Sequence, residues 1–182
     1  MNFLDLVKKR QSTRAYAETP VDRKKIEHCL EAARLAPSAC NSQPWHFVVV
    51  DEPELKNKVA LETFGKIISF NSFSLQAPAL VVVVTDKPKL FARLGALVKK
   101  LPYYFVDIGI ATEHFCLQAE EEGLGTCMLG WFNERSIKKI LNIPKKHKIV
   151  LVITVGYPDS EETRKKTRKS LDDIHSYNEY SK

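Results

Sequence analysis

The chain of 182 residues has the length of one ordinary globular domain, and its 44% hydrophobic and 27% charged residues exclude a disordered or fibrous protein. The formal net charge of +6 is concentrated locally, because five cations lie between Arg164 and Lys169. Nucleic-acid-binding proteins usually spread basic residues along a whole face. The compact cluster therefore favours one or two phosphates of a small molecule, or a solvated tail, over nucleic acid.

The sequence gives no sign of export, membrane insertion or metal binding. Met1–Lys9 has no long apolar region of the kind found in secretory signals, and the longest apolar run, Pro78–Thr85, is too short to cross a bilayer as a helix. The 4 cysteines form no C-x-x-C pair and the 5 histidines no H-x-H or H-E-x-x-H spacing. We expect free thiols, no metal, no membrane partner and a cytoplasmic location.

Hydrophobic periodicity predicts alternating helices and strands. In chain order, the pattern indicates a helix over 2–9, a helix over 22–36, a buried strand over 46–51, a helix over 54–64, a buried strand over 79–85, the longest helix over 103–122, a strand over 125–131, a helix over 134–141 and a last strand over 148–155. Pro37 and Gly123 are expected to end their helices. These elements predict a single α+β domain over residues 1–182, in which helices cover one central sheet.

Two polar segments are candidates for ligand binding. Arg10-Gln11-Ser12-Thr13-Arg14 offers two guanidinium groups and a hydroxyl that could chelate a phosphate, although surface arginine pairs are also common without a ligand. The segment 36–47 is a polar loop bracketed by prolines, and its Ser, Asn and Gln side chains could bond ring heteroatoms or a polyol. It could equally be a simple turn. Trp45 and Phe47, spaced by two before a strand, are expected in the core.

These segments occur in a characteristic order. R-x-S-x-R at 10–14 is followed by P-S-x-x-N-S-Q-P-W-x-F at 37–47, then by G-L-G-T-C at 123–127 with Gly130, and finally by V-G-Y-P at 155–158 and the basic tail. This order resembles the nitroreductase family over nearly the whole chain, and the second motif is the most specific. The resemblance implies a three-layer α/β/α fold with a mostly antiparallel sheet in a domain-exchanged homodimer. The polar tail over 159–182 is expected to cross onto the partner subunit.

The resemblance also implies which residues bind FMN. Arg10, Gln11 and Ser12 would hold its phosphate and lower ribityl chain, and Lys166 and Arg168 would reach the same phosphate from the tail. Arg14 would stabilise the negative charge that reduction places at flavin N1 and O2. The remaining contacts would be Asn71 at the pyrimidine edge, Leu129 and Gly130 near flavin N5, and Pro37, Ser38, Ala39 and Asn41 from the other subunit.

The chain departs from the family pattern at two of these places. Many members carry a lysine three residues after the Asn71 position, where this chain has Ser74, so Arg14 is left as the main cation near the reduced ring. Many larger members carry a glutamate at the Leu129 position. The chain also lacks the long insertion that shapes the substrate cover in larger members, and the sequence therefore leaves the acceptor open.

The activity implied by the resemblance is that of an FMN-dependent oxidoreductase. Hydride would pass from NADH or NADPH to flavin N5 and then to a small-molecule acceptor such as a nitroaromatic, a quinone or a similar planar compound, with no catalytic side chain beyond Arg14 as an electrostatic stabiliser. The absence of a G-x-G-x-x-G loop argues against a separate nicotinamide domain. Alternatives are a non-catalytic flavin-binding or storage module, and a relative that performs reductive dehalogenation, enone reduction or azoline dehydrogenation.

Overall fold

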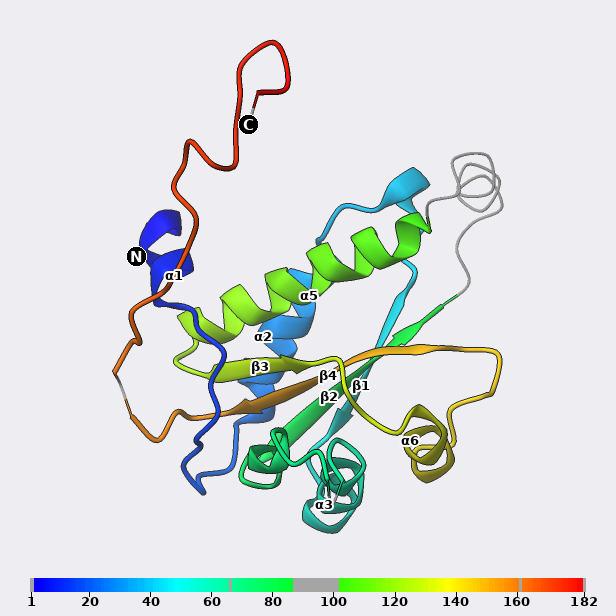
Figure 1. Ribbon diagram of the computed structural model, residues 1–182. Helices are drawn as coiled ribbons and strands as arrows, with labels where there is room; N and C mark the ends of the chain where they lie inside the picture. Colours follow the sequence, from blue (N-terminus) through cyan, green and yellow to red (C-terminus); the bar gives the residue numbers. More distant parts are fainter. Residues whose placement is uncertain (1, 66, 87–101, 161, 182) are drawn as a thin grey trace.

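A sheet of antiparallel strands forms the middle layer of the computed structural model, which describes residues 2–65, 67–86, 102–160 and 162–181 (Figure 1). Within these residues the strand order is β1-β2-β4-β3. The strands are β1 (Trp45–Val50), β2 (Ala79–Thr85), β3 (Gly125–Leu129) and β4 (Ile149–Gly156). All four lie where the sequence predicts them, and each neighbouring pair is antiparallel. The expected sheet is confirmed.

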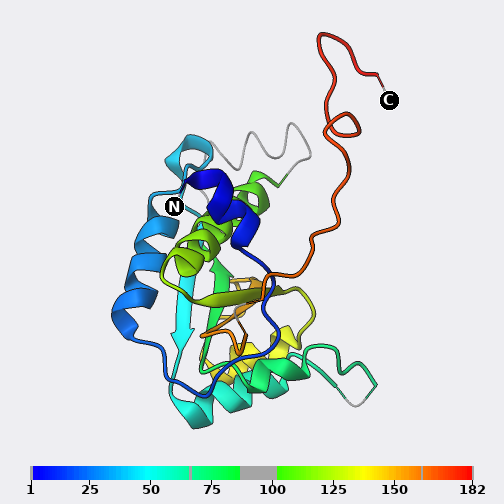
Figure 2. The same ribbon diagram turned by 90° about the vertical axis from the view of Figure 1, so that its left-hand side faces the viewer.

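Helices cover both faces of this sheet. The helices α2 (Arg23–Arg34) and α5 (Tyr103–Glu121) lie on one face, and α3 (Pro53–Leu61) and α6 (Glu134–Ile140) lie on the other (Figures 1 and 2). The short helix α1 (Phe3–Lys9) lies outside α5, and two 3₁₀ turns, η1 (Ala39–Asn41) and η2 (Ser72–Leu75), complete the described elements. The predicted three-layer α/β/α arrangement is therefore confirmed.

The alternation of side chains along β2 divides the core into two halves. Val81 and Val83 pack toward α2 and α5, whereas Leu80 and Val82 pack toward α3 and α6. All four are fully buried. Burial of such a side chain contributes about 1.5–3 kcal/mol, so β2 anchors both layers. The strand β1 was expected to be covered on both faces, but it lies at the sheet edge and is only partly buried.

Capping side chains define the start of the first two helices. Asn2 begins α1 by accepting a hydrogen bond from the Asp5 N–H at 3.0 Å, and Asp22 begins α2 through the Lys24 N–H at 2.9 Å. Gly123, with φ of 75°, ends α5 in the left-handed conformation that glycine adopts without strain. The helices α2 and α3 are shorter than predicted by two to three residues at their C-terminal ends, where α-helices commonly fray.

The segment that follows α1 lies along the sheet. Ser12 forms a parallel bridge with Thr126, and the Thr13 N–H donates to the Thr126 carbonyl at 2.9 Å. This approach is so close that a Cβ atom on Gly125 would lie 2.4 Å from Thr13 Oγ1. Gly125 is therefore required where the N-terminal segment crosses β3.

Apolar side chains on α1 and on the tail are among those that remain uncovered in the described part of the single chain. Phe3 and Leu4 of α1 are 67% and 66% exposed, although the helix is amphipathic. The tail leaves the body beside α1 and extends away from it (Figures 1 and 2). Its apolar side chains are exposed as well, namely Leu171, Ile174, Tyr177 and Tyr180.

The four cysteines carry free thiols, as predicted. Cys29, Cys116 and Cys127 are buried, and Cys40 in η1 is exposed. Burial raises the pKa of the Cys29 and Cys116 thiols to about 12. Among the described helices, none combines the length and hydropathy that a membrane span requires.

Candidate functional site

Three of the predicted phosphate-binding cations lie together, although they come from opposite ends of the chain. Lys166 donates hydrogen bonds to the Val7 and Lys8 carbonyls at the end of α1, next to Arg10. Burial lowers the pKa of Lys166, and the positive charges of Arg10 and Arg168 lower it further. Such mutual repulsion between cations is what an anion placed among them would relieve.

Arg10 makes one ion pair and keeps donors available. Its Nη2 lies 3.1 Å from Glu113 Oε1 of α5, a contact that the sequence pattern did not indicate. Its Nε is buried and has no hydrogen-bond partner among the described residues. A buried donor without a partner is costly, typically by about 1–3 kcal/mol. The guanidinium is therefore held by Glu113 in a position where a further acceptor would stabilise it.

Gln11 and Ser12 connect the N-terminal segment to the tail. Gln11 donates from Nε2 to the Glu162 carbonyl at 2.9 Å and accepts from the Arg164 N–H at 3.2 Å. The Ser12 carbonyl accepts from the Arg164 guanidinium. These bonds bring the basic tail to the R-x-S-x-R segment. Their common effect is to assemble the cation cluster from residues that are about 150 positions apart.

Arg14 is an exposed cation without a paired carboxylate. It forms no hydrogen bond or ion pair with the other residues that the structure describes. Its charge nevertheless acts on its surroundings, because it lowers the pKa of Cys127 against the larger, opposite effect of burial. It acts in the same direction on Tyr16, whose pKa burial raises strongly. Arg14 is thus free to stabilise an additional negative charge beside the sheet.

Asn71 is buried, and its amide group is fixed by two carbonyl groups. Its Nδ2 donates to the Thr63 carbonyl at 3.1 Å and to the Trp131 carbonyl at 3.2 Å. Its Oδ1 accepts no hydrogen bond within the described part of the chain. Both amide hydrogens are therefore used, and the oxygen remains available to a donor on a ligand.

The position of Asn71 depends on Thr63, which the sequence did not single out. Thr63 is fully buried, and its hydroxyl donates to the Ala60 carbonyl at 2.8 Å and bonds Ser74 Oγ at 2.9 Å. Ser74, where many family members have lysine, is thus part of the packing behind η2 and faces no solvent. The only trace of the Thr63–Ser74 contact in the sequence is a polar residue at each of the two positions. Such pairs are too common in sequences to indicate a contact.

Leu129 and Gly130 lie at the end of β3. Leu129 is buried and pairs with Val152, so its side chain belongs to the core. Gly130 is exposed, and a Cβ atom built on it would meet nothing within 4 Å. Its N–H makes no hydrogen bond within the described residues. The Asn71–Trp131 hydrogen bond ties the Asn71 side chain to the residue that follows Gly130.

The proline-bracketed loop is well fixed, but it lies elsewhere. The Ala39 N–H donates to Asp107 Oδ1 at 3.0 Å, and Ser38 Oγ accepts from the Gln43 N–H at 2.9 Å. Cys40, Asn41 and Gln43 have φ values of 53°, 49° and 47°, an unusual run of left-handed residues without glycine. Pro37 and Asn41 remain exposed.

The structure separates this loop from the cation cluster within one chain. Asp107, which holds the loop, is near the start of α5, whereas Glu113, which pairs with Arg10 of the cation cluster at 3.1 Å, lies further along the helix. These two positions lie roughly 9 Å apart along the helix axis. Figure 1 shows η1 beyond the N-terminal end of α5 and α1 beside its other half. One chain therefore brings together the cations, and separately Asn71 with Gly130, but not the loop.

The comparisons with known proteins agree with this fold. The model described as the nitroreductase family matches residues 7–72 and 69–157. A protein of Archaeoglobus fulgidus, named for NADH dehydrogenase and NAD(P)H nitroreductase activity, is 34% identical over 166 residues, which cover 87% of each chain. An iodotyrosine deiodinase of Thermotoga neapolitana is 26% identical, over 88% of this chain and 90% of its own.

A solved structure is similar along the whole chain. The FMN-dependent nitroreductase of Clostridium difficile R20291 superimposes with a TM-score of 0.78 at 27% identity, and the alignment covers 98% of this chain and 100% of the other. Similarity of this extent includes both ends of the chain, which meet at the cation cluster.

Proposed function

Because the chain belongs to the nitroreductase family, we propose that its two groups of available polar atoms bind FMN and support reduction of a small acceptor by NAD(P)H. FMN supplies hydride transfer at its N5 atom when it is bound. The observation that carries the proposal is the cluster of Arg10, Lys166 and Arg168, in which the carboxylates of Glu113 and Glu120 only partly offset the mutual repulsion of the cations. A phosphate at this cluster would compensate their repulsion.

The residues present fit the flavin as well as its phosphate. A flavin ring offers an N3–H donor, which suits the unused Oδ1 of Asn71, and an N5 acceptor, which suits the unused N–H of Gly130. Because both hydrogens of the Asn71 amide are already bonded, we expect it to act as an acceptor only. Arg14 would bind beside N1 and O2, where an unpaired cation stabilises negative charge.

We propose that the working unit is a homodimer. The loop that carries Ser38, Ala39 and Asn41 is held by Asp107, about 9 Å along α5 from the Glu113 that holds Arg10, and we assign the loop's flavin contacts to a second copy of the chain. The uncovered apolar residues on α1 and the tail support the same conclusion, because a partner subunit would bury them.

In turnover, the chain's own residues would bind and orient the flavin and stabilise the charge that develops on it. Arg10 and Lys166 hold the phosphate end, while Asn71 and Gly130 fix the ring edge. Arg14 favours the reduced state by compensating its charge. No nucleophile or metal ligand is assigned a role, and the donor and acceptor would use one open face in turn.

The proposal is tested by purification and reduction of the protein. We expect a yellow dimer whose absorbance near about 450 nm falls when NADH or NADPH is added without oxygen. The double variant Arg10→Ala/Lys166→Ala should lose about 2–4 kcal/mol of FMN binding free energy, because each side chain provides a charge-assisted hydrogen bond. The matched double variant Lys24→Ala/Lys58→Ala removes two exposed lysines elsewhere and should retain FMN. A colourless protein that takes up no FMN would contradict the proposal, and a flavin that NAD(P)H does not bleach would favour a storage module.

A second activity follows from one of the relatives. The iodotyrosine deiodinase from Thermotoga neapolitana covers nearly the same length, which keeps reductive dehalogenation as the alternative acceptor chemistry. Anaerobic turnover of nitroaromatics, quinones, enones and halogenated phenols with the same reduced protein would distinguish these reactions. Release of halide at a rate above that of nitro or quinone reduction would favour dehalogenation.

A further inference from the structure

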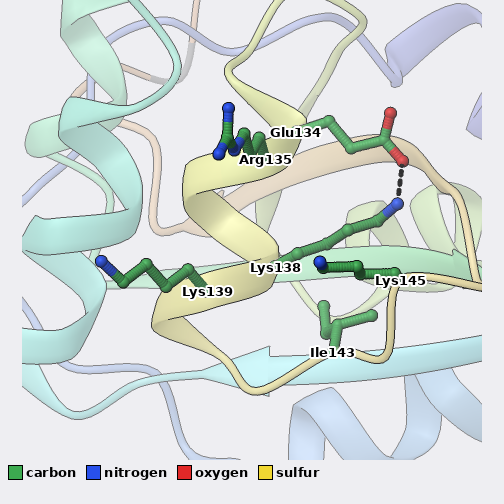
Figure 3. Close-up of a pocket in the computed structure, with 6 residues that line it drawn as sticks. All are labelled: Glu134, Arg135, Lys138, Lys139, Ile143 and Lys145. Carbon is green, nitrogen blue, oxygen red and sulfur yellow. Dashed lines mark ion pairs between the residues drawn. The ribbon is translucent and has the colours of Figure 1, made fainter.

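A cationic cleft on α6 lies outside the proposed flavin site. It has a volume of about 640 Å³ and is lined by Glu134, Arg135, Lys138, Lys139, Ile143 and Lys145. Figure 3 shows Arg135 and Lys139 extending from one side of α6, with Lys138 and Lys145 on the other. The charge pattern of the sequence indicated the cluster of cations in the tail, but it did not indicate this second group of cations on and after α6.

Most of the positive charge in this cleft is uncompensated. Lys138 Nζ lies 2.7 Å from Glu134 Oε1, which also accepts from the Ile149 N–H at 3.0 Å. Burial would raise the pKa of Glu134, but these two hydrogen bonds outweigh it, so its pKa is lowered and the carboxylate stays charged. The side chains of Arg135, Lys139 and Lys145 form no ion pair or hydrogen bond with any other described residue.

The spacing of Arg135 and Lys139 suits a phosphorylated ligand. Residues four apart are neighbours on a helix surface, about 5–6 Å between their Cβ atoms, and two like charges at this spacing repel each other. The helix is held from behind by Ile137, which is fully buried, so the two cations can remain exposed on a fixed element. A guanidinium and an ammonium at this separation can contact one phosphate or pyrophosphate together.

The cleft lies close to the proposed flavin ring along the chain. From Gly130 to Arg135 the backbone can span at most about 18 Å. The intervening residues Trp131–Asn133 line a second hollow of about 450 Å³, together with residues of the segment before Asn71. Because Glu134 of the cationic cleft directly follows Asn133 of this hollow, the two depressions adjoin along the chain.

We propose that Arg135 and Lys139 bind the phosphate groups of the nicotinamide donor, an inference that rests on the proposed function. A nicotinamide dinucleotide carries a pyrophosphate and, in NADPH, a further phosphate on the adenosine ribose. The chain has no G-x-G-x-x-G loop for these groups, and its other cation cluster is assigned to the flavin phosphate. The α6 cations then provide the anchor, and NADPH is the favoured donor because it presents one more phosphate.

The test compares the double variant Arg135→Gln/Lys139→Gln with Lys24→Gln/Lys58→Gln, which removes the same charge from other helices. In the holoenzyme, the α6 variant should raise the KM for NADPH at least tenfold with little change in kcat. Reduction by a phosphate-free donor, N-benzyl-1,4-dihydronicotinamide, should be unchanged. The control should behave like the parent with both donors. Equal KM values for NADPH in the two variants would overturn the inference.

A binding measurement separates this inference from the proposed function. Calorimetric titration with 2′,5′-ADP, which carries phosphates but no nicotinamide, should show binding to the parent and the control, weakened at least tenfold in the α6 variant. Binding that is absent in the parent, or equal in all three proteins, would refute the α6 site even if the flavin is reduced normally. A protein that binds 2′,5′-ADP but whose flavin no nicotinamide bleaches would contradict the proposed function alone.

Discussion

At the scale of single residues, the candidate site depends on polar atoms that the fold leaves without partners. Arg10 Nε, the Gly130 N–H and Asn71 Oδ1 are such atoms within the described residues. Two of these atoms belong to side chains that are firmly held, Arg10 by Glu113 and Asn71 by the Thr63 and Trp131 carbonyls. Rigid support combined with an unused hydrogen-bonding atom is what preorganises a binding site.

Arg14 gives the first prediction. Arg14→Ala should lower the flavin midpoint potential and slow its reduction, because the variant loses a cation beside the charge that reduction creates. The Arg14 side chain is exposed and forms no hydrogen bond or ion pair with the described residues, so the fold should survive. Spectroelectrochemistry of the FMN-loaded protein checks this, with Arg14→Lys as the control that keeps the charge. A potential unchanged in the alanine variant would remove Arg14 from the site.

Thr63 gives the second prediction. Thr63→Val keeps the shape of the side chain but removes its hydrogen bonds to the Ala60 carbonyl and Ser74, and should cost about 1–3 kcal/mol of unfolding free energy. Thr63→Ser keeps the hydroxyl and should cost less. Urea unfolding of both variants measures the difference. If Asn71 orients the ring, only the valine variant should also shift the flavin absorption bands.

At the scale of elements, much of the fold could be predicted because its signals are local. The strands β2 and β4 are continuous β-branched runs, and the caps at Asn2 and Asp22 lie directly before helical periodicity. The edge position of β1 could not be predicted, because burial on a second face depends on which strand is its neighbour. Periodicity within one segment carries no information on such pairing.

The candidate site was predictable only where a motif carries it. Arg10 of R-x-S-x-R and the tail cations do lie together, whereas β3 ends at Leu129 and leaves Gly130 outside the strand that was predicted over 125–131. Their supporting residues Glu113, Thr63 and Asp107 belong to no motif, since each contacts its partner across a long separation or through the backbone. The left-handed conformations of Cys40, Asn41 and Gln43 were also unexpected, because glycine usually occupies such positions.

The loop over 37–44 gives the third prediction. Asp107→Ala removes the acceptor for the Ala39 N–H, and should cost about 1–2 kcal/mol of unfolding free energy and weaken FMN binding. Asp107→Asn keeps an oxygen at the same place and should retain most of both. Urea unfolding and FMN titration measure the two effects. Equal FMN affinity in the alanine and asparagine variants would show that the loop needs no such support.

At the scale of the whole molecule, assembly and cofactor binding can be separated in the tail. Its first part holds Lys166 and Arg168 beside α1, and its last part carries the exposed Leu171, Ile174, Tyr177 and Tyr180. The two properties expected of the tail, a phosphate contact and a subunit contact, therefore lie on consecutive stretches. Variants of the tail can therefore lose the subunit contact and keep the phosphate contact, or the reverse.

This gives the fourth prediction. A chain truncated after Lys169 keeps Lys166 and Arg168 but loses the four apolar side chains, so its dimer should dissociate at least tenfold more readily in sedimentation experiments. The full-length variant Lys166→Ala/Arg168→Ala should remain dimeric and bind FMN more weakly. If the truncated chain is as strongly dimeric as the parent, the tail does not hold the subunits together.

The exposed thiol of Cys40 provides a natural site for following cofactor binding and subunit dissociation by chemical labelling. A reagent such as Ellman's should find one reactive thiol in each native chain and three more on denaturation, because Cys29, Cys116 and Cys127 are buried. Cys40 lies between Ala39 and Asn41, on the loop assigned to the neighbouring subunit's cofactor. The rate at which Cys40 is labelled should therefore fall when cofactor is added and rise when dilution separates the subunits. One colorimetric measurement then follows both cofactor binding and dimer dissociation without an engineered probe.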